Sequence, residues 1–462
     1  MSNKPNILFI CSDQHRYDCI GNSNEYPVKT PNIDRLASEG VWFKNAFTPI
    51  PLCCPARQSL LNGRRPEKFS AFWNYDQSLK TQALEPEDYS WPRQLKKAGY
   101  STSYVGKWHV NPTYNPTYYG FNNYIGLEDY EEFINKKYEK REFKNGFFGE
   151  IDPVPLDDER THWQADRVME YIEDYTEKNE PWHIRLDFVE PHLPCRPVKE
   201  FADLYSKEDV VKWKSFDDTF ENKPYIQKQQ LVNWEIEDMN WDDWSEVVAR
   251  YYAIITQMDD AIGKVLDYID ELGIAKDTIV IYTADHGDMC GGHRMMDKHY
   301  ILYDDVVHVP LIIRWPGVYE SFECKELVYN CLDLPPTILS ILGLEQQEFF
   351  VGRTMEPLLR QEKVLDWRKE VVSTYNGQQF GLYTQRMIRN DKFKYIWNLT
   401  DVDELYDIQN DIGELNNLIY HHEYKLIIAD LRKKLYEILL EEGDGLVQNN
   451  WLKSSLLKSR KI

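Results

Sequence analysis

Four short runs of apolar and β-branched residues, each followed by a polar cluster, constrain the fold of this chain more than any other feature. The runs occupy 7–10, 101–105, 183–188 and 279–283. Short β-rich runs that end at polar clusters are typical of the strands of an α/β sheet. In such sheets the loops after the carboxyl ends of the strands build one common site. The pattern therefore predicts an α/β fold with a mostly parallel sheet sandwiched by helices.

Two segments carry the periodicity of helices that would cover this sheet. Near the N-terminus, Pro31 follows Thr30 and Gly40 ends the run, which is the pattern of a helix with proline in its first turn. Between residues 246 and 272, six apolar residues fall on one helical face: Val248, Tyr252, Ile255, Ile262, Leu266 and Ile269. We interpret both segments as scaffold helices that take no part in a site.

The chain changes character after about residue 360. A strand-like segment covers 386–397, and apolar residues at helical spacing follow between 426 and 439. We therefore predict a large α/β domain over 1–360 and a smaller C-terminal α+β domain over 361–462.

Two stretches inside the larger domain lack such periodicity. They cover about 110–160, rich in Tyr, Asn and charge, and about 195–245, rich in Trp, Asp and Lys. We interpret them as insertions that rim a pocket.

Charge and composition exclude several classes of protein. The formal net charge of −22 argues against nucleic acid as a partner, because phosphate binding needs a basic surface. No run of about 18 apolar residues is present, so we expect no membrane span. The first apolar run is too short for a secretory segment, and we interpret it as the first core strand of a cytoplasmic protein. Eight cysteines without a CxxC pair predict neither a disulfide framework nor a structural zinc site.

Two of the predicted strands end in clusters with the character of metal ligands. Asp13-Gln14 follows the first strand, and Asp285-His286 follows a later one. Carboxylate and amide oxygens suit a hard cation such as Ca²⁺, whereas an imidazole shifts the preference toward Mn²⁺. An aspartate at a strand end is more often a cap of the next turn or helix. Two such clusters in one chain are harder to explain by capping.

The segment Cys53-Cys54-Pro55-Ala56-Arg57, with Leu-Asn-Gly-Arg at 61–64, resembles the maturation signature C-x-P-x-R of the type I, formylglycine-dependent sulfatases of the alkaline phosphatase superfamily. The register selects Cys53, because a signature starting at Cys54 would place Ala56 where proline is needed. The resemblance extends over most of the first 350 or so residues, through the phrases at 30–36, 106–109, 190–192 and 309–317. In the downstream phrase only Asn62 departs from the family, which has threonine there.

The resemblance implies an alkaline-phosphatase-like fold and a specific set of site residues. One divalent metal, Ca²⁺ with Mn²⁺ or Mg²⁺ as alternatives, would be held by Asp13, Gln14, the formylglycine made from Cys53, Asp285 and His286. The sulfate group would lie among Arg57, Lys107, His109, His192 and Lys298. Many relatives carry a second aspartate in place of Gln14, and several carry asparagine in place of His286, which leaves the identity of the metal open.

The chemistry that the resemblance implies is attack on a sulfate monoester by the hydrate of formylglycine 53, deprotonated with help from Asp285. A serine would form a stable sulfate ester, whereas the hydrate can expel sulfate by returning to the aldehyde. Either His192 or Lys298 would protonate the leaving alcohol, and His109 would take the proton of the second hydroxyl, each contributing about 10²- to 10⁴-fold. A maturase that oxidises Cys53 is an implied partner.

We expect a sulfuric ester hydrolase that acts on a small sulfated sugar from a sulfated glycan. The closest alternative is a phosphonate monoester or phosphodiester hydrolase of the same superfamily, against which Lys107 and His109 argue, because those relatives generally lack both. A protein that only binds sulfated glycans, with Cys53 unconverted, is a third reading. Residues near the motifs without a predicted role are Arg64, Asn74, His15, His293 and His299, the last being a possible substrate contact.

Overall fold

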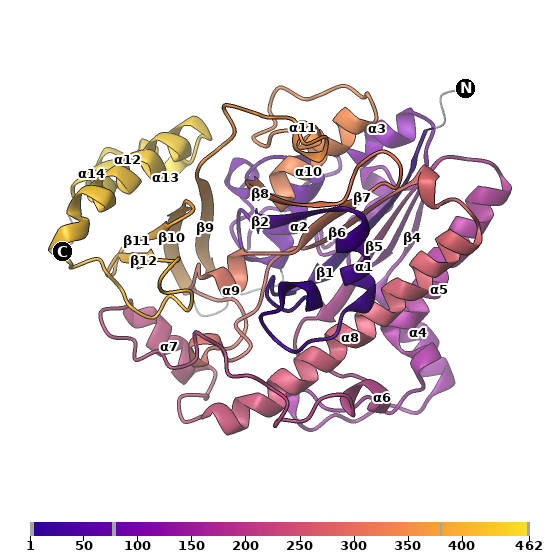
Figure 1. The fold of residues 1–462 in the computed structure, drawn as a ribbon, viewed down its shortest axis with the longest axis horizontal. Helices are drawn as coiled ribbons and strands as arrows, with labels where there is room; N and C mark the ends of the chain where they lie inside the picture. Colours follow the sequence, from indigo (N-terminus) through magenta and orange to yellow (C-terminus); the bar gives the residue numbers. More distant parts are fainter. Residues whose placement is uncertain (1–3, 76–79, 379–380, 460–462) are drawn as a thin grey trace.

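The computed structural model describes residues 4–75, 80–378 and 381–459, and it contains two sheets (Figure 1). The large sheet has the strand order β4-β3-β5-β1-β6-β7-β2-β8. Its strands are β1 (Asn6–Asp13), β2 (Val41–Phe47), β3 (Ser101–Gly106), β4 (Asn123–Ile125), β5 (Trp182–Pro191), β6 (Thr278–Ala284), β7 (Leu311–Arg314) and β8 (Phe322–Tyr329). All four strands predicted from the apolar runs are present, as β1, β3, β5 and β6.

The large sheet is mostly parallel, as predicted. Strand β1 lies between β5 and β6 and is parallel to both, and β3 and β4 continue in the same direction. Only β7 runs antiparallel to its neighbours, β6 and β2. Because β1, β3, β5 and β6 are parallel and adjacent, the loops after their carboxyl ends meet at one edge of the sheet.

Helices cover both faces of this sheet, and alternate residues of β1 point to each side. On one face Leu8 and Ile10 pack with α1 (Pro31–Glu39), α5 (Arg160–Glu177) and the second half of α8 (Trp241–Glu271). On the other face Ile7 and Phe9 pack in one core with α2 (Cys53–Asn62), α3 (Pro92–Lys97) and α10 (Asn330–Ile341). Both predicted scaffold helices are therefore confirmed, as α1 and α8.

The second sheet is antiparallel and lies in the C-terminal part of the chain (Figure 1). Its order is β12-β11-β10-β9, built from β9 (Val371–Gln378), β10 (Gly381–Arg389), β11 (Phe393–Asn398) and β12 (Glu404–Asp407). Helices α12 (Lys425–Glu441), α13 (Gly445–Gln448) and α14 (Asn450–Lys458) share a core with it. The domain boundary near residue 360 remains a prediction.

The strand-like segment at 386–397 is not one strand. It contains the end of β10, a turn and most of β11, and the two strands form a hairpin. Asn390 causes the break, because its side-chain Oδ1 accepts hydrogen bonds from the backbone N–H groups of Lys392 and Phe393. In the helix that follows, Leu426 is 84% exposed, and the buried stripe is formed by Ile428, Leu431, Leu435 and Leu439.

The two stretches interpreted as insertions contain short elements between long loops. The first includes the edge strand β4 and helix α4 (Leu127–Lys137), and the second includes α6 (Lys199–Ala202) and α7 (Tyr225–Asn233). Two further short helices, α9 (Asp304–Val307) and α11 (Glu356–Leu359), lie outside them. None of the helices in the described ranges is both long and apolar enough to cross a bilayer. All eight cysteines are described, and each is a buried free thiol.

Candidate active site

Four buried side chains gather where β1 and β6 end beside the first turn of α2. One ligand atom from each of Asp13, Cys53, Asp285 and His286 lies within 4.8 Å of those of the other three. The Cys53 Sγ is 3.2 Å from His286 Nε2 and 3.7 Å from Asp13 Oδ1. His286 Nδ1 donates to the Gly287 carbonyl at 2.8 Å, so the Nε2 lone pair of a neutral imidazole faces the cluster.

Arg57, on the second turn of α2, holds the carboxylates of this cluster in place. Its Nη2 donates to Asp13 Oδ2 at 2.9 Å, its Nε to Asp285 Oδ2 at 2.9 Å, and its Nη1 to Asp187 Oδ2 at 2.6 Å. All four side chains are fully buried. Because each nitrogen of the guanidinium has a carboxylate partner, Arg57 orients the cluster.

Two lysines add positive charge beside Cys53. Lys107 Nζ lies 2.6 Å from Asp13 Oδ2, and Lys298 Nζ donates to Gln14 Oε1. Burial alone would raise the pKa of the Cys53 thiol, but Lys298, Lys107 and His286 hold it well below its ordinary value. The position of Sγ is therefore one at which the surrounding protein stabilises negative charge.

Asp288 orients the side chain of Gln14. The side-chain Nε2 of Gln14 donates to Asp288 Oδ2 at 2.6 Å, which turns its Oε1 toward Lys298. The backbone of Gln14 is in the left-handed region, at φ 62°, and its N–H donates to Asp285 Oδ1 at 3.2 Å. The amide oxygen is consequently at the edge of the cluster, bound to a lysine.

His192 and Lys298 face each other across the pocket. Lys298 Nζ is 3.2 Å from His192 Nε2, and His192 Nδ1 is 2.5 Å from the Leu193 carbonyl oxygen. An ammonium group can only donate, so in this geometry Lys298 carries the proton of the pair and His192 Nε2 accepts it. On the Cys53 side, His109 also lowers the pKa of the thiol, and its ring packs edge-to-face against Tyr75 with ring centroids 5.2 Å apart.

All ten predicted site residues thus lie in the same region of the molecule. The residues without a predicted role have structural contacts. His15 bonds to Tyr282 and to the Cys19 carbonyl, and His293 bonds to Asp218. Asn74 accepts a hydrogen bond from the backbone N–H of Cys54 at 3.0 Å and so caps the start of α2.

Three acids that position the site were missed by sequence reasoning: Asp187, Asp288 and Asp297. Asp297 lies 3.2 Å from Lys298 Nζ and 2.8 Å from His299 Nε2. Asp187 lies inside a strand predicted from its apolar residues, where a charged residue is unexpected. Because a buried charge is rarely left unpaired, Asp187 inside a core strand was the available signal that an arginine lies next to it.

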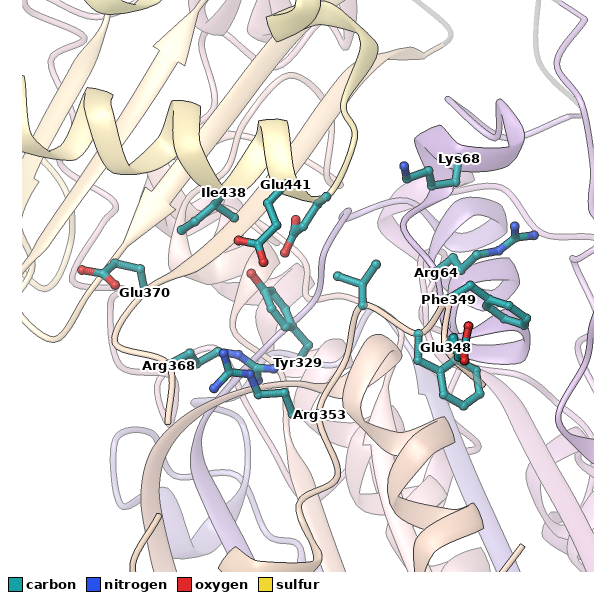
Figure 2. Close-up of a pocket in the computed structure, with 13 residues that line it drawn as sticks. Arg64, Lys68, Tyr329, Glu348, Phe349, Arg353, Arg368, Glu370, Ile438 and Glu441 are labelled. Carbon is teal, nitrogen blue, oxygen red and sulfur yellow. The ribbon is translucent and has the colours of Figure 1, made fainter. Parts of the chain in front are cut away.

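A separate cavity lies between helix α12 and the large domain (Figure 2). It is lined by Arg64, Tyr329, Phe349, Arg368 and Glu441 among others, and by none of the ten predicted site residues. Arg368 is bound to Asp333, and Arg64 donates to Asn62 Oδ1 at 2.5 Å. This cavity is therefore distinct from the site at Cys53.

A buried position for negative charge, set among carboxylates, lysines and histidines at the carboxyl edge of a parallel sheet, defines a hydrolase of anionic esters. The model of the family described as "Sulfatase" matches residues 5–344, and the chain belongs to this family, within the alkaline phosphatase superfamily. It is accordingly a sulfuric ester hydrolase that acts on sulfate monoesters. A second model, described as "N-sulphoglucosamine sulphohydrolase, C-terminal", matches residues 291–441.

Similar proteins cover nearly the whole chain. The arylsulfatase of Clostridium perfringens is 29% identical over 97% of this chain and 97% of its own length. The N-acetylglucosamine-6-O-sulfatase of Bacteroides thetaiotaomicron is 25% identical over 95% of this chain and 86% of its own. Among solved structures, a phosphonate monoester hydrolase from Silicibacter pomeroyi has a TM-score of 0.82 at 22% identity, with 96% of each chain covered. At that identity the likeness shows the fold alone.

Proposed function

We propose that this sulfatase works through a formylglycine made from Cys53, beside one divalent metal held by Asp13, Gln14, Asp285, His286 and residue 53. The observation that carries the proposal is the burial of four potential ligands within 4.8 Å of one another. In the structure, Cys53 Sγ stands where the hydroxyl oxygens of a hydrated formylglycine would lie. That hydrate supplies a nucleophile whose sulfate ester can break down again to the aldehyde.

The residues present suit a metal ion. Burial and the neighbouring Asp13 carboxylate raise the pKa of Asp285, so a cation bound at the two carboxylates would stabilise the charged form of Asp285. Two carboxylates and an amide oxygen are ligands typical of Ca²⁺, our first choice, with Mn²⁺ or Mg²⁺ as alternatives because of His286. Such an ion acts as a Lewis acid toward the sulfuryl oxygens and lowers the pKa of a bound hydroxyl.

The cations of the chain itself would receive the sulfate group. Lys107 and Lys298 lie on either side of the Cys53 position, and their charge would offset that of the sulfuryl oxygens in a site with little water. Lys107 Nζ is fixed by Asp13, and Lys298 Nζ by Gln14 and Asp297. Arg57 contributes by hydrogen bonds that fix the carboxylates of Asp13 and Asp285 in place.

Two proton transfers remain for the histidines and Lys298. The Lys298–His192 pair holds one proton between Nζ and Nε2, and it would deliver that proton to the departing alcohol. His109, which is close enough to lower the pKa of Cys53, would take the proton of the second hydroxyl. The division between His192 and Lys298 is tested below.

For the substrate we propose a small sulfated sugar, a mono- or disaccharide. Support comes from relatives whose names give their substrates: N-acetylglucosamine-6-O-sulfate in one, and the 2-O-sulfate of a Δ4,5-hexuronate in another, which is 27% identical over 96% of this chain. A protein of the same fold was solved with its substrate D-glucosamine-2-N,6-O-disulfate, at a TM-score of 0.79 and 21% identity.

We also propose a cytoplasmic location and a maturase partner. Eight buried free thiols, with no disulfide between them, suit a reducing compartment. A reducing compartment in turn favours a maturase that does not depend on oxygen, and full conversion of Cys53 in a host without such an enzyme would refute this.

The decisive experiment combines mass spectrometry with two assays. Protein co-expressed with a maturase should show the Cys53 peptide about 18 Da lighter than the cysteine form. It should cleave an aryl sulfate faster than an aryl phosphonate ester, and Cys53→Ala should abolish both activities. Preference for the phosphonate ester would favour the phosphonate monoester hydrolase alternative. If Cys53 remains a thiol and neither ester is cleaved, the catalytic assignment loses its main support and the reading as a protein that only binds sulfated glycans gains.

A further inference from the structure

A second pocket adjoins the site at His192. Its lining includes Tyr130, Arg141, Phe143, Glu190, His192 and Arg196. His192 contributes to the site at Cys53 and to this pocket. Its Nε2 is 3.2 Å from Lys298 Nζ, and the residue also lines the pocket. His192 therefore connects the site at Cys53 with this pocket.

Arg196 differs from the other arginines in the pocket. Arg141 Nη1 donates to Asp152 Oδ2 at 2.6 Å, and Arg160 Nε donates to Glu190 Oε1 at 2.9 Å. Among the described residues, the guanidinium of Arg196 has neither a hydrogen bond nor an ion pair, and its Nε is buried. It lies instead over the ring of Phe143, 3.8 Å from the centroid. The stacking fixes the plane of the guanidinium and leaves its donors open.

Three of the four carboxylates that line the pocket have partners, and the fourth, that of Glu131, is exposed. Asp152 is bound by Arg141 and also accepts from the Val154 N–H at 3.1 Å. Glu159 accepts from the backbone N–H of Thr161 at 2.8 Å, as the cap of α5. Glu190 is bound by Arg160 through Oε1, while its Oε2 is buried without a hydrogen bond among the described residues. None of these four acids is paired with Arg196.

The neighbouring acids compensate the charge of Arg196 only in part. Burial lowers the pKa of Arg196, Asp152 and Glu150 offset this effect only in part, and Arg160 and Arg141 add to it. A guanidinium with open donors in a half-buried pocket is costly unless a ligand completes it. Its planar fork matches the paired oxygens of a carboxylate or of a sulfate group.

We propose that Arg196, held on Phe143, is a specificity-determining residue that binds a second anionic substituent, a carboxylate or another sulfate, of the sugar whose scissile sulfate lies at residue 53. The inference rests on the proposed function, since it assumes a sugar sulfate at that site. It predicts preference for sugars with two anionic groups over sugars with one.

The test compares Arg196→Gln with Arg141→Gln, which removes the same charge from the same pocket but from a paired arginine. Four substrates are needed: an aryl sulfate, an N-acetylglucosamine whose one sulfate is its only charged group, a disulfated glucosamine and a 2-O-sulfated unsaturated uronate. Wild-type protein should prefer at least one of the last two. Arg196→Gln should lower kcat/KM for that substrate by about 10- to 100-fold and change the first two by less than about threefold. Arg141→Gln should have a much smaller effect.

A further variant distinguishes paired hydrogen bonds made by Arg196 from a general effect of its positive charge. Arg196→Lys should recover only part of the loss, because an ammonium cannot form the paired hydrogen bonds. Equal losses on all four substrates, equal losses in the two glutamine variants, or no wild-type preference for a doubly anionic sugar would overturn the inference. Absence of cleavage of even the aryl sulfate would instead refute the proposed function. The preferred sugar identifies the substituent as carboxylate or sulfate.

Discussion

Arg57 Nη1 donates to Asp187 Oδ2 at 2.6 Å, and neither side chain is exposed to solvent. Asp187 also accepts from Arg185 Nε at 2.7 Å and from the Tyr104 hydroxyl at 2.7 Å. The aspartate thus anchors the arginine that in turn aligns Asp13 and Asp285. In these hydrogen bonds Asp187 contacts neither Cys53 nor its potential metal ligands. Through Arg57 it nevertheless sets the positions of the Asp13 and Asp285 carboxylates.

Replacing Asp187 by asparagine should therefore damage both stability and catalysis. Asp187→Asn removes the carboxylate that pairs with Arg185 and one of the three that pair with Arg57, and breaking such a buried pair typically costs about 3–5 kcal/mol of unfolding free energy. Denaturant unfolding measures this cost. The matched control is Asp203→Asn, which breaks a pair with Lys199 whose side chains are 74% and 57% exposed and should cost less than about 1 kcal/mol. Equal midpoints for the two variants would contradict the anchoring role.

Calcium should stabilise the folded protein if the cluster at residue 53 holds it. A ligand present at about 100 times its Kd adds about 2.7 kcal/mol to the stability of the native state. The Tm should fall on chelation, recover with Ca²⁺, and recover less with Mg²⁺ or Mn²⁺. Asp13→Asn should abolish the response, whereas the exposed Asp174→Asn should retain it. A wild-type Tm that is the same with chelator and with each metal would disprove metal binding.

The roles of His192 and Lys298 can be separated by the leaving group. If His192 delivers the proton, His192→Gln should lower kcat by about 10²- to 10⁴-fold on an alkyl or sugar sulfate, whose alcohol leaves poorly. The loss should be small on 4-nitrophenyl sulfate, which needs no protonation. Lys298→Met should lower both rates, because its charge also faces the sulfate position. If only the lysine variant shows the dependence on the leaving group, Lys298 is the acid.

Acid should destabilise the protein through His183, which lies inside β5 against Trp91 with ring centroids 5.0 Å apart. Burial and the nearby Arg185 guanidinium lower the pKa of His183 to about 3. The unfolded chain binds more protons than the folded chain below about pH 6.5, so stability falls as pH falls. Between pH 7 and pH 5 the loss from this residue is about 2 kcal/mol.

The measurement is denaturant unfolding at both pH values. His183→Leu should reduce the difference between them by that amount, and His422→Gln, which removes an exposed imidazole, should leave it unchanged. An unchanged pH dependence in His183→Leu would show that protonation of this buried histidine is not involved.

The parts of the site that follow strand ends could be predicted from sequence. Asp13, Lys107, His192 and Asp285 each come after an apolar run, and parallel pairing of adjacent strands brings those ends together. Cys53 was found from its spacing to Pro55 and Arg57, which resembles a known signature. The two scaffold helices were found because each has one apolar face.

Residues that position another residue of the site could not be predicted from the sequence. Asp187 and Asp288 hold Arg57 and Gln14, and such pairings join residues 130 or more positions apart in the chain. The sequence shows at most that Asp187 lies inside a core strand and needs a partner, and it does not show which residue that partner is. The hairpin at Asn390 was missed for a different reason: the segment has enough β-prone residues for one strand, and the break depends on side-chain hydrogen bonds of a single asparagine.

The burial of Cys53 has a consequence for the order of events during synthesis. Its thiol is only 1% exposed, and one of the groups that cover it, His286, lies 233 residues later in the chain. At a synthesis rate of about 5–20 residues per second, roughly 10–50 s pass between the emergence of the two residues. A modifying enzyme therefore has a limited period in which Cys53 is reachable, and conversion depends on elongation speed as well as on the enzyme.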